Sequence, residues 1–146
     1  MGVKNIMDNN KGTNIAYGIQ EVSPVYKPIK HIEKYWGCMH TLFENDLYTV
    51  KRIFMKKDSQ SSMEYHVKKR ETYYIEKGKL KVGIRIGRAK NKSFIMEKGD
   101  LFDIEPGLMH MRIALEDTVI IEHSTKDNDG DSHIVEDGRY YVHKED

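Results

Sequence analysis

Four side chains that can bind a metal ion lie in two short segments of the chain. The first segment contains Glu64 and His66, with Glu71 after four intervening residues, and the second segment ends at His110 after a Pro-Gly turn. Residues two apart in a β-strand project from the same face, so Glu64 and His66 should point together. A turn through residues 67–70 would return the chain as the next strand and place Glu71 beside them.

Two imidazoles and two carboxylates form a mixed nitrogen and oxygen donor set. This set suits one borderline divalent ion, for which we expect Zn, with Mn, Fe, Co and Ni as alternatives. Calcium and magnesium would require more oxygen ligands. Two anionic ligands would neutralise the ion, which weakens it as a Lewis acid. The site therefore favours chelation of a diol or hydroxy-carbonyl compound over formation of hydroxide.

Strands must position these donors, and the sequence from Trp36 onward has the pattern of short strands separated by turns. The expected strands are 47–55, 71–76, 79–86, 93–96, 101–104, 110–115 and 118–123. Strands at this spacing indicate an all-β barrel or sandwich. Residues 126–146 are acidic and rich in turn formers, so we expect one short helix or a path along the barrel rim.

Composition limits the classes of function. The chain of 146 residues has the length of one domain, and its net charge of +1 gives no reason to expect a nucleic acid or an acidic membrane as partner. Its single cysteine, Cys38, excludes an internal disulfide and fits a reducing compartment. No apolar run reaches the length of a membrane span. We expect a cytoplasmic protein.

The N-terminal residues differ from the rest in composition. Residues 1–30 are rich in Asn, Gly and Lys and show no sustained period, so we expect an irregular arm, followed by one domain over 31–146. The arm contains apolar residues that could pack on the barrel or on a second subunit: Ile15, Tyr17, Ile19, Val22, Val25 and Tyr26. Barrels with such arms often pair, so we expect a homodimer.

The two donor segments resemble the two sequence motifs of the cupin superfamily. The first motif usually reads His-x-His, three or four residues, Glu, six residues and Gly; here Glu64 takes the place of the first His, and Glu71 and Gly78 match. The second motif corresponds to residues 99–110. The resemblance implies a single jelly-roll barrel, or double-stranded β-helix, in which Glu64, His66, Glu71 and His110 hold the ion.

Within this superfamily, residues 33–139 are similar to the type II phosphomannose isomerase domain, which often forms half of a bifunctional guanylyltransferase–isomerase. The resemblance implies conversion of an aldose phosphate such as mannose 6-phosphate to a ketose phosphate through a metal-stabilised enediolate. Such an enzyme would serve nucleotide-sugar or surface-polysaccharide supply. The chain has Glu64 where that family has Gln, and Met111 where it has Arg, so the sugar stays open.

Lys51 matches a lysine of that family and is our leading candidate for a second catalytic group in the cavity. If its side chain points inward, Glu71 would be its natural partner and would set its pKa. The alternative is that Lys51 lies on the outer face, because Arg52 competes for the inward direction.

A phosphate group needs a cationic clamp. Arg112 shares a strand face with His110 and should reach the same cavity, and Arg85 is a weaker candidate. Lys68 belongs to a basic cluster, 68–70, that either contacts substrate or forms a solvated turn. Tyr73 borders the substrate or belongs to the core.

Other functions and residues stay open at this point. The chain could be a non-catalytic cupin module that binds a small sugar-like ligand, or an iron oxygenase, although a second carboxylate argues against the latter. Of the remaining histidines, we expect His31, His133 and His143 at the surface, and His40 and His123 in the core or at the rim.

Overall fold

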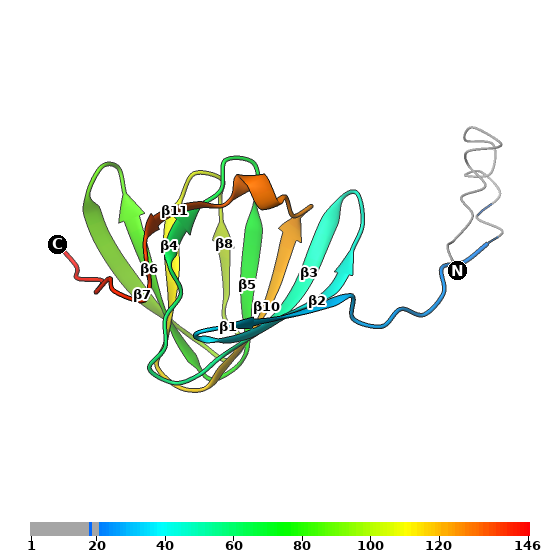
Figure 1. Cartoon of the computed structure of the whole chain (residues 1–146), viewed down its shortest axis with the longest axis horizontal. Coiled ribbons are helices and arrows are strands. Elements are labelled where there is room, and N and C mark those ends of the chain that lie inside the picture. Colours follow the sequence, from blue (N-terminus) through cyan, green and yellow to red (C-terminus); the bar gives the residue numbers. More distant parts are fainter. Residues whose placement is uncertain (1–17, 19–20) are drawn as a thin grey trace.

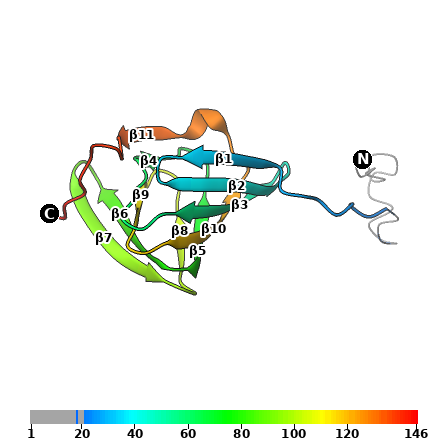
Figure 2. The same cartoon turned by 60° about the horizontal axis from the view of Figure 1, so that its bottom comes forward.

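The chain forms two antiparallel sheets that enclose one interior (Figures 1 and 2). The computed structural model describes residue 18 and residues 21–146. One sheet has the strand order β1-β2-β3-β10-β5-β8, and the other has the order β11-β4-β9-β6-β7. The strands are β1 (Lys30–Lys34), β2 (Gly37–Glu44), β3 (Tyr48–Met55), β4 (Met63–Tyr65), β5 (Glu71–Lys77), β6 (Lys79–Ile86), β7 (Lys90–Glu97), β8 (Leu101–Ile104), β9 (Met109–Ala114), β10 (Thr118–Thr125) and β11 (His133–Glu136). This is the all-β jelly-roll architecture that the sequence predicts.

Alternating side chains decide what faces the interior. On β3, Lys51, Ile53 and Met55 are buried, whereas Arg52 between them is exposed. The period of two is the expected consequence of the strand pleat. Each strand thus presents one set of side chains to the interior and the other to solvent.

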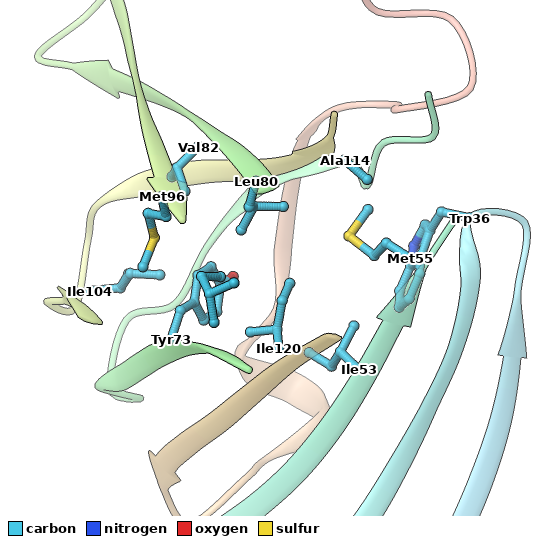
Figure 3. Close-up of a cluster of buried hydrophobic side chains, with 11 residues drawn as sticks. Trp36, Ile53, Met55, Tyr73, Leu80, Val82, Met96, Ile104, Ala114 and Ile120 are labelled. Carbon is cyan, nitrogen blue, oxygen red and sulfur yellow. The ribbon is translucent and has the colours of Figure 1, made fainter. Parts of the chain in front are cut away.

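One end of the interior is a packed apolar cluster to which both sheets contribute (Figure 3). Ile53 and Ile75 come from the first sheet and Leu80 and Val82 from the second, and all four side chains are fully buried. Complete burial of each such side chain contributes about 1.5–3 kcal/mol. The other members of the cluster are Trp36, Met55, Tyr73, Met96, Ile104, Ala114 and Ile120.

The turn between β5 and β6 requires a glycine. Gly78 has a φ of 91°, and a Cβ atom there would lie 2.3 Å from the carbonyl oxygen of Asp117. Any other residue would combine an unfavourable backbone conformation with a steric clash. Gly78 therefore fixes the hairpin that follows the site-bearing strand β5.

The N-terminal arm and the C-terminal segment, which lie outside the predicted strands, are placed differently. The C-terminal segment contains a 3₁₀ turn, η1 (Asp129–Asp131), followed by β11, and lies along one rim (Figure 1). In the arm, Val22 and Val25 are exposed, and the Tyr26 ring lies 5.3 Å from that of Phe43. Ile15, Tyr17 and Ile19 lie outside the described residues. Within the described part of the chain, no helix has the length and apolar character needed to cross a membrane.

Candidate metal centre

The four predicted donors meet at one point between the two sheets. Glu64 of β4 pairs with His110 of β9, and Glu71 begins β5. Nε2 of His66 lies 3.7 Å from Oε1 of Glu64 and 3.5 Å from Oε1 of Glu71. Nε2 of His110 lies 2.8 Å from the same Glu71 oxygen. The four side chains named as possible donors from the sequence therefore lie side by side.

Backbone carbonyls orient both imidazole rings. Nδ1 of His66 lies 3.0 Å from the carbonyl oxygen of Asp131, and Nδ1 of His110 lies 2.8 Å from that of Leu108. A carbonyl oxygen can only accept, so each Nδ1 carries the proton and donates it. Each Nε2 is then left with a lone pair, which is the tautomer that binds a metal ion.

The atoms that face one another are all acceptors. Among the residues that the structure describes, Nε2 of His66, Nε2 of His110 and both carboxylate oxygens of Glu71 are buried without a hydrogen-bond partner. An imidazole lone pair 2.8 Å from a carboxylate oxygen is repulsive unless a cation or a proton lies between them. These residues fit one divalent cation, which would satisfy the two Nε2 atoms and Oε1 of Glu71, whereas Oε2 of Glu71 lies 3.2 Å from Nζ of Lys69.

Asp131 holds the turn that carries His66. Its carboxylate accepts hydrogen bonds from the backbone N–H groups of Val67, Lys68 and Lys69 at 2.8, 3.0 and 2.9 Å. Burial would raise the pKa of Asp131, but these three donors lower it below the ordinary range. The carbonyl and the carboxylate of one residue therefore fix both the ring of His66 and the path to Glu71.

Lys69 supplies a buried positive charge that the sequence reasoning missed. Nζ of Lys69 lies 3.2 Å from Glu71, 3.1 Å from Asp127 and 3.8 Å from Glu122. Burial would lower the pKa of Lys69, but the three carboxylates raise it above the ordinary range. Of the two alternatives for 68–70, the solvated turn is therefore wrong for Lys69, whereas Lys68 is exposed.

Glu71 is ionised despite its burial. Burial alone would raise its pKa, but hydrogen bonds from His110 and His66 when these rings are protonated, together with the Lys69 ammonium, hold it well below the ordinary range. An anionic carboxylate in contact with two imidazoles is a ready ligand for a divalent ion.

Lys51 points inward, but its partner differs from the expected one. Nζ of Lys51 lies 2.6 Å from Oδ2 of Asp127. Glu71 is already surrounded by the two imidazoles and Lys69, so the predicted pairing of Lys51 with Glu71 is wrong. Asp127, from the loop after β10, takes that place.

Glu122 is a second group that the sequence reasoning missed. It is buried on β10 opposite Lys51, and its Oε2 has no hydrogen-bond partner among the described residues. Burial and the negative charge of Glu71 raise the pKa of Glu122, against the opposing effect of nearby Lys69 and Arg112. The only sequence signal was a charged residue directly after the apolar run 119–121 of an expected strand.

Arg112 lies on the inward face with His110, as predicted, but it is held firmly. It is 8% exposed, its Nη1 donates to the Tyr73 hydroxyl at 3.1 Å, and its guanidinium lies 5.1 Å from the centre of the Trp36 ring. Tyr73 is fully buried in the apolar cluster and does not line the cavity. This corrects the alternative in which Tyr73 borders a substrate.

Arg85 and His143 lie elsewhere than expected. Arg85 is on the outer face of β6, where it contacts Glu136 at 3.0 Å and donates to the Tyr141 hydroxyl at 3.1 Å. The apolar side chains of β6 face the interior, and Arg85 alternates with them, so its side chain faces away from the cavity. It therefore cannot serve as the predicted substrate contact. His143 is buried, not exposed, with Nε2 2.8 Å from the Lys92 carbonyl oxygen, because the C-terminal segment packs over Gly83.

A cavity of about 320 Å³ opens beside the donors. Glu64 is the one metal-ligand candidate that lines it, so an ion held there would face this space. The polar wall comes from Lys51, Glu64, Lys69, Arg112, Glu122 and Asp127, and the lining also includes Lys30, Ile32, Lys34, Trp36 and Met39. Lys68 lines only an adjoining hollow of about 570 Å³.

Comparison with known proteins places the chain in a family. Residues 38–142 match the family model described as Cupin, so the chain belongs to the cupin family. No curated protein matches the chain. The narrower likeness to the type II phosphomannose isomerase domain is carried by the sequence motifs alone.

Solved structures show the same fold at low sequence identity. KdgF from Halomonas sp. has a TM-score of 0.57 and 16% identity, over 64% of this chain and 81% of that chain. The capsular polysaccharide assembling protein CapF from Staphylococcus aureus has a TM-score of 0.65 and 18% identity, over 76% of this chain and 33% of its own. Oxalate decarboxylase from Bacillus subtilis has a TM-score of 0.66 and 16% identity, over 90% and 38%. The chain thus spans about a third of the last two proteins.

Proposed function

We propose that this cupin is a metal-dependent isomerase that interconverts an aldose phosphate and a ketose phosphate, of the mannose 6-phosphate type. The observation that carries the proposal is the pair of imidazoles whose Nδ1 atoms are fixed by carbonyls and whose Nε2 atoms converge with Glu71 beside the cavity. A divalent ion bound there would polarise a sugar carbonyl and hold the neighbouring hydroxyl.

Glu122 is the residue that we propose moves the proton between the two carbons. It lines the cavity, it is buried, and its raised pKa brings it closer to the working range of an acid–base catalyst. Lys51, the group favoured by the sequence motif, is ion-paired with Asp127, and a charged ammonium group cannot accept a proton.

The phosphate would bind at the rim. Lys30 and Lys34 of β1 both line the cavity, and within the described part of the chain neither forms an ion pair. Arg112, predicted as the clamp, is deeper and already donates to Tyr73. We therefore assign Arg112 to orienting the cavity wall and the two lysines to the phosphate.

A second candidate is a module that binds an uncharged sugar without turnover. The ion pairs of the buried lysines favour this binding module. Lys51 and Lys69 are each neutralised by carboxylates, so little net positive charge remains inside the cavity. CapF, which shares the fold, is named for assembling capsular polysaccharide, so a carbohydrate ligand suits either candidate.

The test is proton exchange in deuterated water. Protein of known metal content is incubated with mannose 6-phosphate and with fructose 6-phosphate, and the products are analysed by NMR. We expect metal-dependent deuterium at C2 of the aldose or C1 of the ketose, with loss of exchange in Glu122→Gln and retained metal. Sugar binding by calorimetry without exchange would identify the binding module and overturn the isomerase. Consumption of dioxygen with iron, abolished by zinc, would instead identify an oxygenase.

A further inference from the structure

A second group of metal-binding side chains lies on the outer face of the β1–β2 hairpin. The strand register pairs His31 with His40 and Glu33 with Cys38. Residues two apart on a strand share a face, and directly opposed residues are neighbours, so the four side chains form one cluster. Met39, which alternates with Cys38 and His40, packs against the apolar core. The cluster therefore faces away from the cavity.

The donor atoms are close enough to share one ion. One ligand atom from each of His31, Cys38 and His40 lies within 4.8 Å of the others. The two imidazole centres are 4.3 Å apart, and Nε2 of His31 lies 3.2 Å from Oε1 of Glu33. Zinc bonds of about 2.0–2.3 Å in a tetrahedral site place donor atoms about 3.5 Å apart, so modest side-chain rotations would complete the shell.

The donor types select a class of ion. A thiolate and two imidazoles suit Zn²⁺ and Co²⁺, and they exclude Mg²⁺ and Ca²⁺, which take oxygen ligands. We propose that His31, Cys38 and His40, with Glu33 as the fourth ligand, form a second transition-metal site of this protein. The side chains of His31 and Glu33 are 47% and 78% exposed, so the ion would exchange with solvent readily.

Occupancy of this site would act on the wall of the cavity. Among the strands that the structure describes, β1 lies at the edge of its sheet and pairs with β2 alone. Its other face carries Lys30, Ile32 and Lys34, which line the cavity. An ion joining the two strands would fix this edge and the lysines on it.

Cobalt substitution tests the site separately from the buried centre. Cys38 is the only cysteine of the chain, and the centre around Glu71 and His110 contains no sulfur. A thiolate-to-cobalt charge-transfer band can therefore arise only at the hairpin. With the thiol kept reduced, we expect Co²⁺ to give this band in the wild-type chain and in His110→Ala alike.

The variants decide which side chains hold the ion. Cys38→Ser should abolish the band and lower bound cobalt by one ion per chain, and His40→Ala should weaken binding at least tenfold. His123→Ala, which removes an exposed histidine of the same sheet, is the matched control and should change neither. The proposal is overturned if wild-type protein gives no band, if the band keeps its affinity in a His31→Ala/His40→Ala variant, or if it saturates at one ion per two chains. Loss of the buried centre would leave the band unchanged, so the two proposals fail independently.

Discussion

The two ends of the barrel interior differ in chemistry although the same strands build both. On β5, the inward positions run from Glu71 through Tyr73 to Ile75, and on β3 they run from Lys51 to Ile53. β9 shows the same change, from a histidine and an arginine to an alanine. One end therefore stabilises the fold by apolar burial, and the other positions ionisable groups around a cavity.

The polar end is held together by mutual compensation of charge. Lys69 contacts three carboxylates, and Lys51 contacts one of the same three, Asp127. Desolvation offsets most of the attraction in such buried networks, so they contribute little net stability. Substitutions at the apolar end should therefore mainly reduce stability, whereas removal of the metal donors at the polar end should mainly reduce ligand binding.

The largest expected effect is the loss of a core side chain. Leu80→Ala at the apolar end should lower the free energy of unfolding by about 2–5 kcal/mol, because the buried leucine leaves a cavity. Urea denaturation measures the change. Leu101→Ala, at a position 65% exposed, should cost less than about 0.5 kcal/mol. Equal effects of the two variants would contradict the assignment of this end as the core.

The opposite result is expected for a donor at the polar end. His110→Ala should reduce zinc affinity by more than about 100-fold. Loss of a residue that only orients a metal ligand usually lowers metal affinity by about 10–100-fold, and loss of the ligand itself should lower it further. Competition with a chelator measures the affinity. The metal-free variant should lose less stability than Leu80→Ala, because removal of the ring costs the Nδ1 hydrogen bond to Leu108 but also removes the unpartnered buried Nε2. A metal-free protein destabilised as strongly as Leu80→Ala would show that the polar end is part of the core.

The strands that the sequence predicted best are those with clear alternation and a glycine turn. The predicted limits of 79–86 and 101–104 coincide with β6 and β8. β1, β2, β4 and β11 were not assigned individually. Three of these four are short, and the longer β2 carries partly buried side chains on both faces, so period two is weak there.

The candidate site was predictable only where local spacing decides it. Glu64 and His66 lie two apart, so alternation along an extended segment predicts that they point together, although β4 ends at Tyr65 and the Asp131 carbonyl fixes the ring of His66. Lys69 and Glu122 were missed because their roles depend on which strand face is inward and on residues from the loop after β10. The wrong partner for Lys51 has the same cause, since Asp127 is 76 positions away along the chain.

A smaller effect, with a defined pH dependence, is expected at Asp127. Burial would raise its pKa, but Lys51 and Lys69 lower it below the ordinary range. A lowered carboxyl pKa stabilises the fold above the unfolded pKa of about 3.9, and this contribution is lost as the pH falls through the folded value. Asp127→Asn should therefore be less stable than wild type by about 1 kcal/mol at pH 7, and the difference should shrink below about pH 4. Urea denaturation at several pH values measures it. A stability difference that grows on acidification would show that the pKa of Asp127 is not lowered in the folded protein.

The smallest expected effect is that of an arginine on the outer face of the second sheet, compared with an arginine on its inner face. Arg112 and Arg85 lie on neighbouring strands, β9 and β6, but only Arg112 faces the cavity. Arg85→Ala should leave zinc affinity and sugar-phosphate exchange within about twofold of wild type and cost less than about 1 kcal/mol, because its contact with Glu136 is a peripheral ion pair. Arg112→Ala should disturb both, since it removes the hydrogen bond to Tyr73 and the packing on Trp36. The measurement is the exchange rate of the two variants side by side. Alternation on β6 keeps the Arg85 side chain out of the cavity, so a larger loss of exchange in Arg85→Ala than in Arg112→Ala would contradict the inward and outward assignment.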